Sequence, residues 1–250
     1  MTTNNFPLVI AAARNSLLSV IFPEECAVCT GQVDDSHGIP ACTGCWAETK
    51  LFDGSEMLCS KCGAFFGVGA ADRLIQCPFC REHFYDKAVA CGIYEKALAA
   101  SVIALKTTPH ISLRLRQIIE TAMSRLDMSS FELVIPIPLS AARRLERGFN
   151  QAELIGSVVG NFAKVPVDLI SLIRTRHTPI HRVGMDKRAR ALSVENVFHV
   201  ARPKLIQGRR ILLVDDVFTS GSTASFCAKM LKKHGAARVE VFTLARAVMD

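Results

Sequence analysis

The spacing of hydrophobic positions changes along the chain and predicts where helices and strands lie. From residue 87 onward, short apolar runs alternate with stretches whose apolar residues recur every three or four positions. The runs predict strands at 89–93, 133–135, 210–214 and 239–244, with a further edge strand at 196–200. The longer stretches predict helices at 98–105, 115–126, 152–162 and 222–234. Strands that alternate with helices indicate a parallel sheet with helices on both faces, so the expected fold class is α/β.

The first third of the chain has a different pattern. Residues 1–22 have apolar positions at helical spacing and predict a short amphipathic or buried helix. Residues 23–86 have little apolar periodicity and are rich in Cys, Gly and turn residues. We therefore expect three parts: a helix at 1–22, a cysteine module at 23–86 and an α/β domain at 87–250.

Eight of the ten cysteines fall in four C-x-x-C pairs, which is an arrangement typical of metal sites rather than of disulfides. Two pairs supply four thiolates, the tetrahedral set that zinc prefers. We expect two structural zinc ions in consecutive ribbons, pair one with pair two and pair three with pair four. An interleaved pairing, and a role in contacting protein or nucleic acid, are the alternatives. The eight expected ligands are Cys26, Cys29, Cys42, Cys45, Cys59, Cys62, Cys77 and Cys80.

The segment 211–223 carries the clearest chemical motif. An apolar strand ends in Asp215 and Asp216, a loop of small residues follows, and a helix begins. Small side chains let backbone N–H groups approach an anion, and the helix N-terminus adds positive potential. The expected monophosphate site is made by Thr219, Ser220, Gly221, Ser222 and Thr223. The two carboxylates are placed to accept hydrogen bonds from a ribose diol or to bind hydrated magnesium. An acidic turn with an ordinary helix cap is the plainer alternative.

Charge is distributed unevenly between the two halves. The formal net charge is +7, with 11 basic and 13 acidic residues in 1–130 (net −2) and 19 basic and 10 acidic in 131–250 (net +9). A positive field of this kind attracts partners that carry phosphate. No apolar stretch reaches the roughly 18 residues that a membrane helix needs. No secretory signal is visible, and with thiols arranged for metal we expect a cytoplasmic protein without a membrane span.

The motif at 211–223 resembles the signature of type I phosphoribosyltransferases. Further segments are similar to the ComF family of competence-associated proteins, namely Phe22-Pro23-x-x-Cys26, Leu105-Lys106, 134–140 (VIPIPLS), 147–151 (RGFNQ) and 211–223. The resemblance implies a type I phosphoribosyltransferase-like sheet joined to an N-terminal zinc-ribbon module. It also implies that the acids contact ribose hydroxyls and that the loop holds the 5′-phosphate of phosphoribosyl pyrophosphate, with magnesium.

The same resemblance extends to arginines and partners. Arg143, Arg144 and Arg147, together with the basic segment 174–190, are candidates to cover the pyrophosphate, and Asn150 is a candidate helix cap. The implied role is ligand binding in DNA uptake or related nucleotide and DNA metabolism. The implied partners are single-stranded DNA and a DNA-uptake helicase or other competence protein. An active phosphoribosyltransferase and a non-catalytic phosphoribosyl pyrophosphate sensor are the alternatives.

Overall fold

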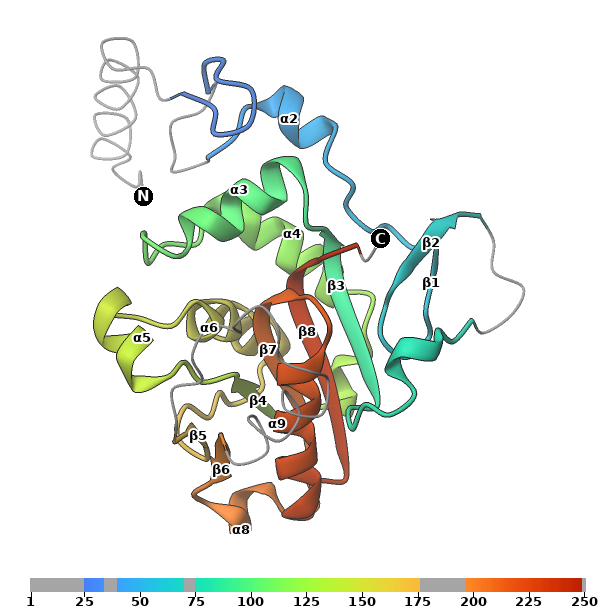
Figure 1. Cartoon of the computed structure of the whole chain (residues 1–250), viewed down its shortest axis with the longest axis vertical. Helices are drawn as coiled ribbons and strands as arrows, with labels where there is room; N and C mark the ends of the chain where they lie inside the picture. Colours follow the sequence, from blue (N-terminus) through green and yellow to red (C-terminus); the bar gives the residue numbers. More distant parts are fainter. Residues whose placement is uncertain (1–24, 34–39, 70–74, 176–196, 249–250) are drawn as a thin grey trace, which may run out of the picture.

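Four parallel strands form the main sheet in the order β3-β8-β7-β4 (Figure 1). They are β3 (Lys87–Ile93), β4 (Leu133–Pro136), β7 (Arg210–Phe218) and β8 (Arg238–Arg246). This computed structural model describes residues 25–33, 40–69, 75–175 and 197–248. The predicted parallel sheet is confirmed, and the helix predicted at 1–22 lies outside the described residues.

All four strands of the main sheet are longer than the sequence predicted, β7 by the most. β7 continues four residues past the predicted end at Val214, because Asp215, Val217 and Phe218 pair with the last residues of β8. The β4 ladder stops at Pro136, opposite Val214. Proline has no backbone N–H and cannot extend a ladder as a donor. Asp215 and Asp216 therefore lie within β7, beyond the end of β4, rather than in a turn after the strand.

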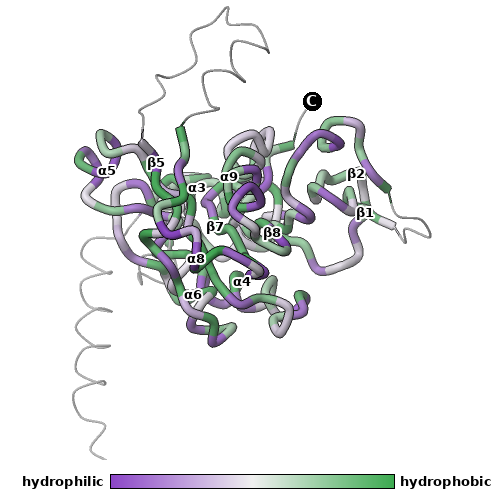
Figure 2. The backbone as a smooth tube through the Cα atoms, turned by 90° about the horizontal axis from the view of Figure 1, so that it is seen from below, coloured by the Kyte–Doolittle hydropathy of each residue, from purple (hydrophilic) through white to green (hydrophobic). Residues whose placement is uncertain are grey.

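The predicted strand at 196–200 forms outside the main sheet. β6 (Phe198–Val200) pairs antiparallel with β5 (Leu172–Arg174) as a separate two-stranded sheet. A third small sheet pairs β1 (Glu56–Leu58) with β2 (Phe65–Val68), again antiparallel. Figure 2 shows the β1–β2 hairpin on one side of the molecule and α5 and β5 on the other.

The four predicted helices are present as α3 (Lys96–Ala104), α4 (Leu113–Met123), α6 (Gln151–Ala163) and α9 (Ser222–Lys233). The shorter helices are α2 (Thr43–Ala47), α5 (Ala141–Arg147) and α8 (Pro203–Ile206), with 3-10 turns η1 (Pro78–Cys80) and η2 (Met128–Ser130). Within the described segments no helix has the length and apolar character needed to cross a membrane.

The sheet separates two hydrophobic clusters, because successive residues of a strand face opposite sides. Leu212 and Val214 pack in one cluster with residues of α3, α4 and α6, and Ile211 and Leu213 pack in the other with residues of α9. Figure 1 shows α9 lying across β7 and β8, and the residues of α3, α4 and α6 pack on the opposite face. Both faces are therefore covered, as the α/β pattern predicted.

Candidate metal centres and anion site

The eight paired cysteines form two groups of four, each within one ribbon. The first cysteine cluster is Cys26, Cys29, Cys42 and Cys45, and the second is Cys59, Cys62, Cys77 and Cys80. Within each cluster the Sγ atoms all lie within 4.8 Å of one another. This grouping confirms the consecutive pairing, one with two and three with four, and excludes the interleaved alternative.

The sulfur geometry fits zinc. Sγ–Sγ distances are 3.7 Å for Cys26–Cys45 and for Cys29–Cys42 in the first cluster. In the second cluster they are 3.5 to 3.6 Å. Four Zn–S bonds of about 2.3 Å at tetrahedral angles put the sulfurs about 3.8 Å apart, so each cluster needs little adjustment to close on the ion. Zinc would act here as a structural ion, because four thiolates leave no position open for a substrate.

Backbone hydrogen bonds lower the pKa of one thiol in each cluster, which favours its metal-binding thiolate form. Burial acts to raise the pKa of Cys26, but backbone hydrogen bonds from Cys29, Cys42 and Val28 lower this pKa to about 6. In the second cluster burial is again opposed by backbone hydrogen bonds, and the pKa of Cys59 falls to about 6. A thiolate at neutral pH is the form that binds metal.

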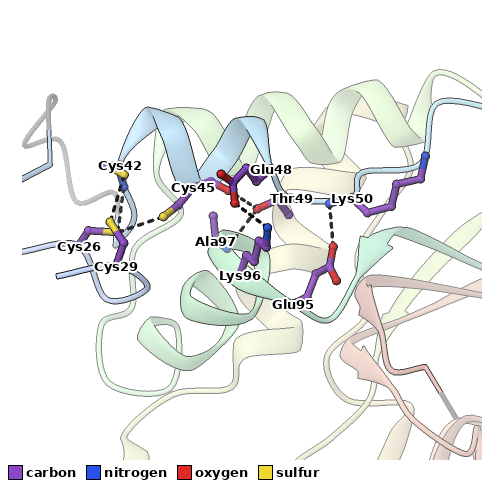
Figure 3. Close-up of polar contacts among 10 residues, drawn as sticks. All are labelled: Cys26, Cys29, Cys42, Cys45, Glu48, Thr49, Lys50, Glu95, Lys96 and Ala97. Carbon is purple, nitrogen blue, oxygen red and sulfur yellow. Dashed lines mark hydrogen bonds and ion pairs between the residues drawn. The ribbon is translucent and has the colours of Figure 1, made fainter. Parts of the chain in front are cut away.

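The first cluster attaches to the start of α3 (Figure 3). After α2, the Thr49 hydroxyl donates to the Cys45 carbonyl over 2.7 Å and accepts from the Ala97 backbone N–H over 3.1 Å. Lys96 forms an ion pair with Glu48 at 2.6 Å. These contacts join the first ribbon to the start of α3. They lie on the side of the sheet that α3, α4 and α6 cover.

The second cluster contacts the sheet through a buried arginine. Arg246, at the end of β8 and 3% exposed, donates to the Cys62 carbonyl over 2.6 Å and to Cys62 Sγ over 3.5 Å. Its guanidinium lies 4.5 Å from the centre of the Phe218 ring. The Tyr85 ring meets the same Phe218 ring edge-on, with centroids 5.7 Å apart. These contacts lead from a metal ligand to the last residue of β7.

The predicted anion loop follows Phe218 directly. Gly221 is in the left-handed region with φ of 75°, and α9 begins at the next residue with no side-chain cap. Thr219, Ser220, Ser222 and Thr223 are exposed, and the Ser220 and Ser222 hydroxyls lie 2.9 Å apart. Among the described residues, the backbone N–H groups of Thr223 and Ala224 have no acceptor. Open donors at a helix N-terminus favour a bound anion.

The two acids lie partly buried in β7, two residues before this loop. Asp215 Oδ1 accepts from the Asp216 N–H over 2.9 Å, and Asp216 Oδ1 accepts from the Val217 N–H over 2.7 Å. Burial and the neighbouring Asp216 carboxylate raise the pKa of Asp215 well above its ordinary value, while Arg174 acts to lower it. A ligand that donates hydrogen bonds or brings positive charge to this pair would therefore stabilise the ionised carboxylates.

The predicted arginines differ in their surroundings. Arg144 forms an ion pair with Glu153 of α6. Arg143 lies close enough to Arg174 to help burial lower the pKa of the latter guanidinium. Within the described part of the chain, the side chains of Arg143 and Arg147 form no ion pair. Arg174 thus brings positive charge toward Asp215, and Arg143 lies near Arg174. Residues 176–190 of the predicted basic segment lie outside the described residues.

Asn150 has the predicted capping role and a second one. Its Oδ1 accepts from the Ala152 N–H over 3.1 Å at the start of α6. Its Nδ2 donates to the Ile137 carbonyl over 3.0 Å, which fixes the loop between Pro136 and Pro138. One side chain therefore joins the loop after β4 to the helix that follows α5.

Sequence reasoning missed His83, Phe218 and Arg246. The His83 Nδ1 lies 2.6 Å from the Tyr85 hydroxyl, and burial, with Lys61 and Arg246 nearby, lowers the pKa of this imidazole. A Cβ on Gly221 would lie 3.2 Å from His83 Cε1 and 2.8 Å from Phe218 Cε1. The one available signal was Arg246, a charged residue directly after the apolar Leu244 and Ala245 of β8. No local pattern indicates that residue 83 lies beside residue 221.

Comparison with known proteins agrees with this architecture. Residues 17–81 match a family model described as a double zinc ribbon domain. Competence protein F of Haemophilus influenzae is 30% identical over 237 residues, covering 90% of this chain and 98% of that protein. The DNA utilization protein YhgH of Escherichia coli K12 is 27% identical over 219 residues, covering 82% and 89%. Competence protein ComFC of Bacillus subtilis is 34% identical over 119 residues, covering 46% and 44%.

Matching solved structures cover about half of this chain. The glutamine phosphoribosylpyrophosphate amidotransferase from B. subtilis, complexed with ADP and GMP, has a TM-score of 0.36 at 18% identity and covers 52% of this chain and 26% of that one. The purine phosphoribosyltransferase from Pyrococcus horikoshii has a TM-score of 0.32 at 13% identity, covering 54% and 85%.

The fold and the cysteine clusters define a mixed α/β protein with a parallel sheet and an N-terminal double zinc ribbon. The match to competence protein F extends over nearly the whole length of both chains. The chain therefore belongs to the ComF family.

Proposed function

We propose that the protein binds phosphoribosyl pyrophosphate, or a nucleotide-like ligand with the same phosphoribosyl group, and serves in DNA uptake or related DNA metabolism. The observation that carries the proposal is the position of Asp215 and Asp216 at the end of β7, two residues before the loop 219–223 and the open end of α9. The names of two relatives, competence protein F and DNA utilization protein, support the cellular role.

Each part of the site suits one part of the ligand. The N–H groups of Thr223 and Ala224 and the hydroxyls of the loop would hold the 5′-phosphate. The Asp215 and Asp216 carboxylates would accept from the ribose hydroxyls. Arg143 and Arg174 would provide positive charge toward the pyrophosphate. Magnesium, which prefers oxygen ligands and phosphate oxygens, would supply further neutralising charge when bound.

A calorimetric titration tests ligand binding. Zinc-loaded protein is titrated with phosphoribosyl pyrophosphate and magnesium, and compared with Asp215→Asn and with Asp127→Asn, a distant acid before η2 as the matched control. We expect Asp215→Asn to weaken binding by at least about tenfold, the effect of losing a charged hydrogen-bond acceptor, and Asp127→Asn to leave it unchanged. Absence of binding by the unsubstituted protein would contradict the proposal.

Asp215→Asn should weaken ligand binding but stabilise the ligand-free protein, because the pKa of Asp215 is raised in the folded state. Because the folded-state pKa lies above the unfolded value, the unfolded state loses its proton first as pH rises. Stability is therefore lost as pH rises from the unfolded pKa to the folded one, and remains lower above it. Asp215→Asn removes this cost, so we expect its Tm at neutral pH to rise by about 2–4 °C, with little change near pH 3.

Turnover is measured separately. Release of pyrophosphate when a purine or pyrimidine base is added would identify an active phosphoribosyltransferase. Tight binding without release under any base would identify a sensor that binds without turnover.

DNA binding is a second measurement on the same protein. The net charge of +9 on residues 131–250 favours a polyanion. We expect affinity for a single-stranded oligonucleotide to fall steeply with salt and to survive Asp215→Asn. A DNA affinity that does not change with salt would contradict this electrostatic account.

A further inference from the structure

The second zinc ribbon reaches the anion loop with one histidine. His83 lies three residues after Cys80, and its partly buried ring faces Gly221 through Cε1, the carbon between the two ring nitrogens. The next residue, Phe84, donates its backbone N–H to the Ser225 hydroxyl in the first turns of α9, over 3.1 Å. Residues 83–85 are thus held against the end of β7 and the start of α9.

The hydrogen bond to Tyr85 determines which nitrogen of His83 carries the proton. The Tyr85 side chain is 1% exposed, and its hydroxyl has one partner among the described residues, His83 Nδ1 at 2.6 Å. A phenol has one proton to donate, and a buried donor without an acceptor is costly. The hydroxyl therefore donates to Nδ1, so that the neutral imidazole carries its proton on Nε2. Nε2 is bonded to the ring carbon that faces Gly221.

The surroundings hold this ring in place. Lys61 Nζ donates to the His83 carbonyl over 2.7 Å. The His83 and Tyr85 rings lie 5.2 Å apart, and Tyr85 packs edge-on against Phe218, which lies beneath the Arg246 guanidinium. A donor fixed in this way loses little freedom when it binds an anion, which is the condition for an effective contact.

We propose that His83 donates its Nε2–H to the phosphate held by loop 219–223, so that the second ribbon supplies part of the ligand site. The proposal rests on the proposed function, since it assigns a further donor to the same site. It makes the second ribbon a wall of that site in addition to a stabilising unit. The ligand class it recognises is a phosphomonoester such as ribose 5-phosphate.

The test uses the full zinc-loaded chain and two probes. Ribose 5-phosphate carries the group expected in the loop, and inorganic pyrophosphate with magnesium does not. We expect His83→Phe, which keeps a ring without a donor, to weaken ribose 5-phosphate binding by about tenfold, and pyrophosphate binding to be unchanged. His83→Gln, which keeps an N–H donor, should recover part of the loss. His234→Phe is the matched control, because His234 lies at the other end of α9 with its Nδ1 on the Met230 carbonyl.

A nitrogen-15 NMR spectrum of the unsubstituted protein gives an independent readout. We expect the His83 ring signals, assigned in the unsubstituted protein by correlation with the His83 backbone resonances, to show a protonated Nε2 whose shift changes when ribose 5-phosphate is added. This measurement decides the question even if a His83 variant loses zinc or folds poorly. An Nδ1-protonated ring, or an Nε2 signal that ignores the ligand, would overturn the proposal, as would equal affinity of His83→Phe and the unsubstituted protein. If the unsubstituted protein binds neither ribose 5-phosphate nor phosphoribosyl pyrophosphate, the proposed function itself fails.

Discussion

The two cysteine clusters have the same ligands and similar geometry, but they belong to opposite faces of one sheet. Cys26 and Cys45 pack with α3, α4 and α6, and in this cluster Cys29 is exposed. All four cysteines of the second cluster are buried and pack with α9 and the other face of the sheet. The first ribbon packs on the face covered by α3, α4 and α6, whereas the second lies beside the start of α9 and the loop 219–223. A shared metal motif therefore does not imply a shared role.

The largest expected difference comes from removing one ligand of each cluster. Cys59→Ser should lower zinc from about two ions per chain to about one, and reduce affinity for phosphoribosyl pyrophosphate by more than about tenfold. The reason is that the contacts of Arg246 and Phe84 with the loop region depend on a folded second ribbon. Cys29→Ser should also lose about one zinc but keep affinity within about twofold. Zinc analysis and calorimetry on both variants check this, and equal losses of affinity would remove the distinction.

A pair of glycines tests how tightly the loop is packed on the second-ribbon side. Gly221 and Gly148 have nearly the same φ, 75° and 76°, but only Gly221 has neighbours where a Cβ would lie. Gly148→Ala should cost about 1–2 kcal/mol, the strain of a left-handed residue alone. Gly221→Ala should cost about 1–3 kcal/mol more, through crowding against Phe218, and should weaken ligand binding.

Denaturant unfolding of both glycine variants measures the difference directly. Similar free energies of unfolding for the two variants would mean that Phe218 and His83 move aside easily. The close packing of the loop on the second ribbon would then be disproved.

Arg246 is the next test, because it joins the second cluster to β7. Arg246→Met should lower the free energy of unfolding by about 2–3 kcal/mol, since a charged donor to the buried Cys62 carbonyl is lost. Arg246→Lys keeps the charge but loses the planar guanidinium, so it should recover only part of the lost free energy of unfolding. Thermal melts of the zinc-loaded proteins measure this, and a fully stable Arg246→Met would show that the contact is dispensable.

The smallest effect is expected at the first cluster. Lys96 and Glu48 form an exposed ion pair, with side chains 41% and 69% accessible. Lys96→Ala should leave the free energy of unfolding almost unchanged, with zinc content and ligand affinity as in the unsubstituted protein. A larger loss would show that the first ribbon depends on its attachment to α3 more than exposed contacts allow.

Much of the fold was predictable because it is local. Apolar spacing located the four strands and four main helices, and C-x-x-C spacing located both clusters. The end of β7 was predicted too early, because two adjacent acids indicate a turn unless the pairing with β8 is known. That pairing joins residues far apart in the sequence and leaves no local pattern.

The candidate site was predictable only in part for the same reason. The small-residue loop and the acids are consecutive, so their spacing is informative. The contacts of His83 with Gly221 and of Arg246 with Cys62 connect the second ribbon with the last part of the α/β region. Only the folded chain brings these side chains together.

The contacts of residues 83–85 limit how the chain can be divided. Composition changes at residue 86, yet Phe84 donates to Ser225, and Tyr85 packs on Phe218. The short connection between Cys80 and β3 therefore has little freedom to vary in length. A fragment beginning at Lys87 would lose the contacts of residues 83–85 with β7 and α9, so shortened versions intended for biochemistry should retain the second ribbon.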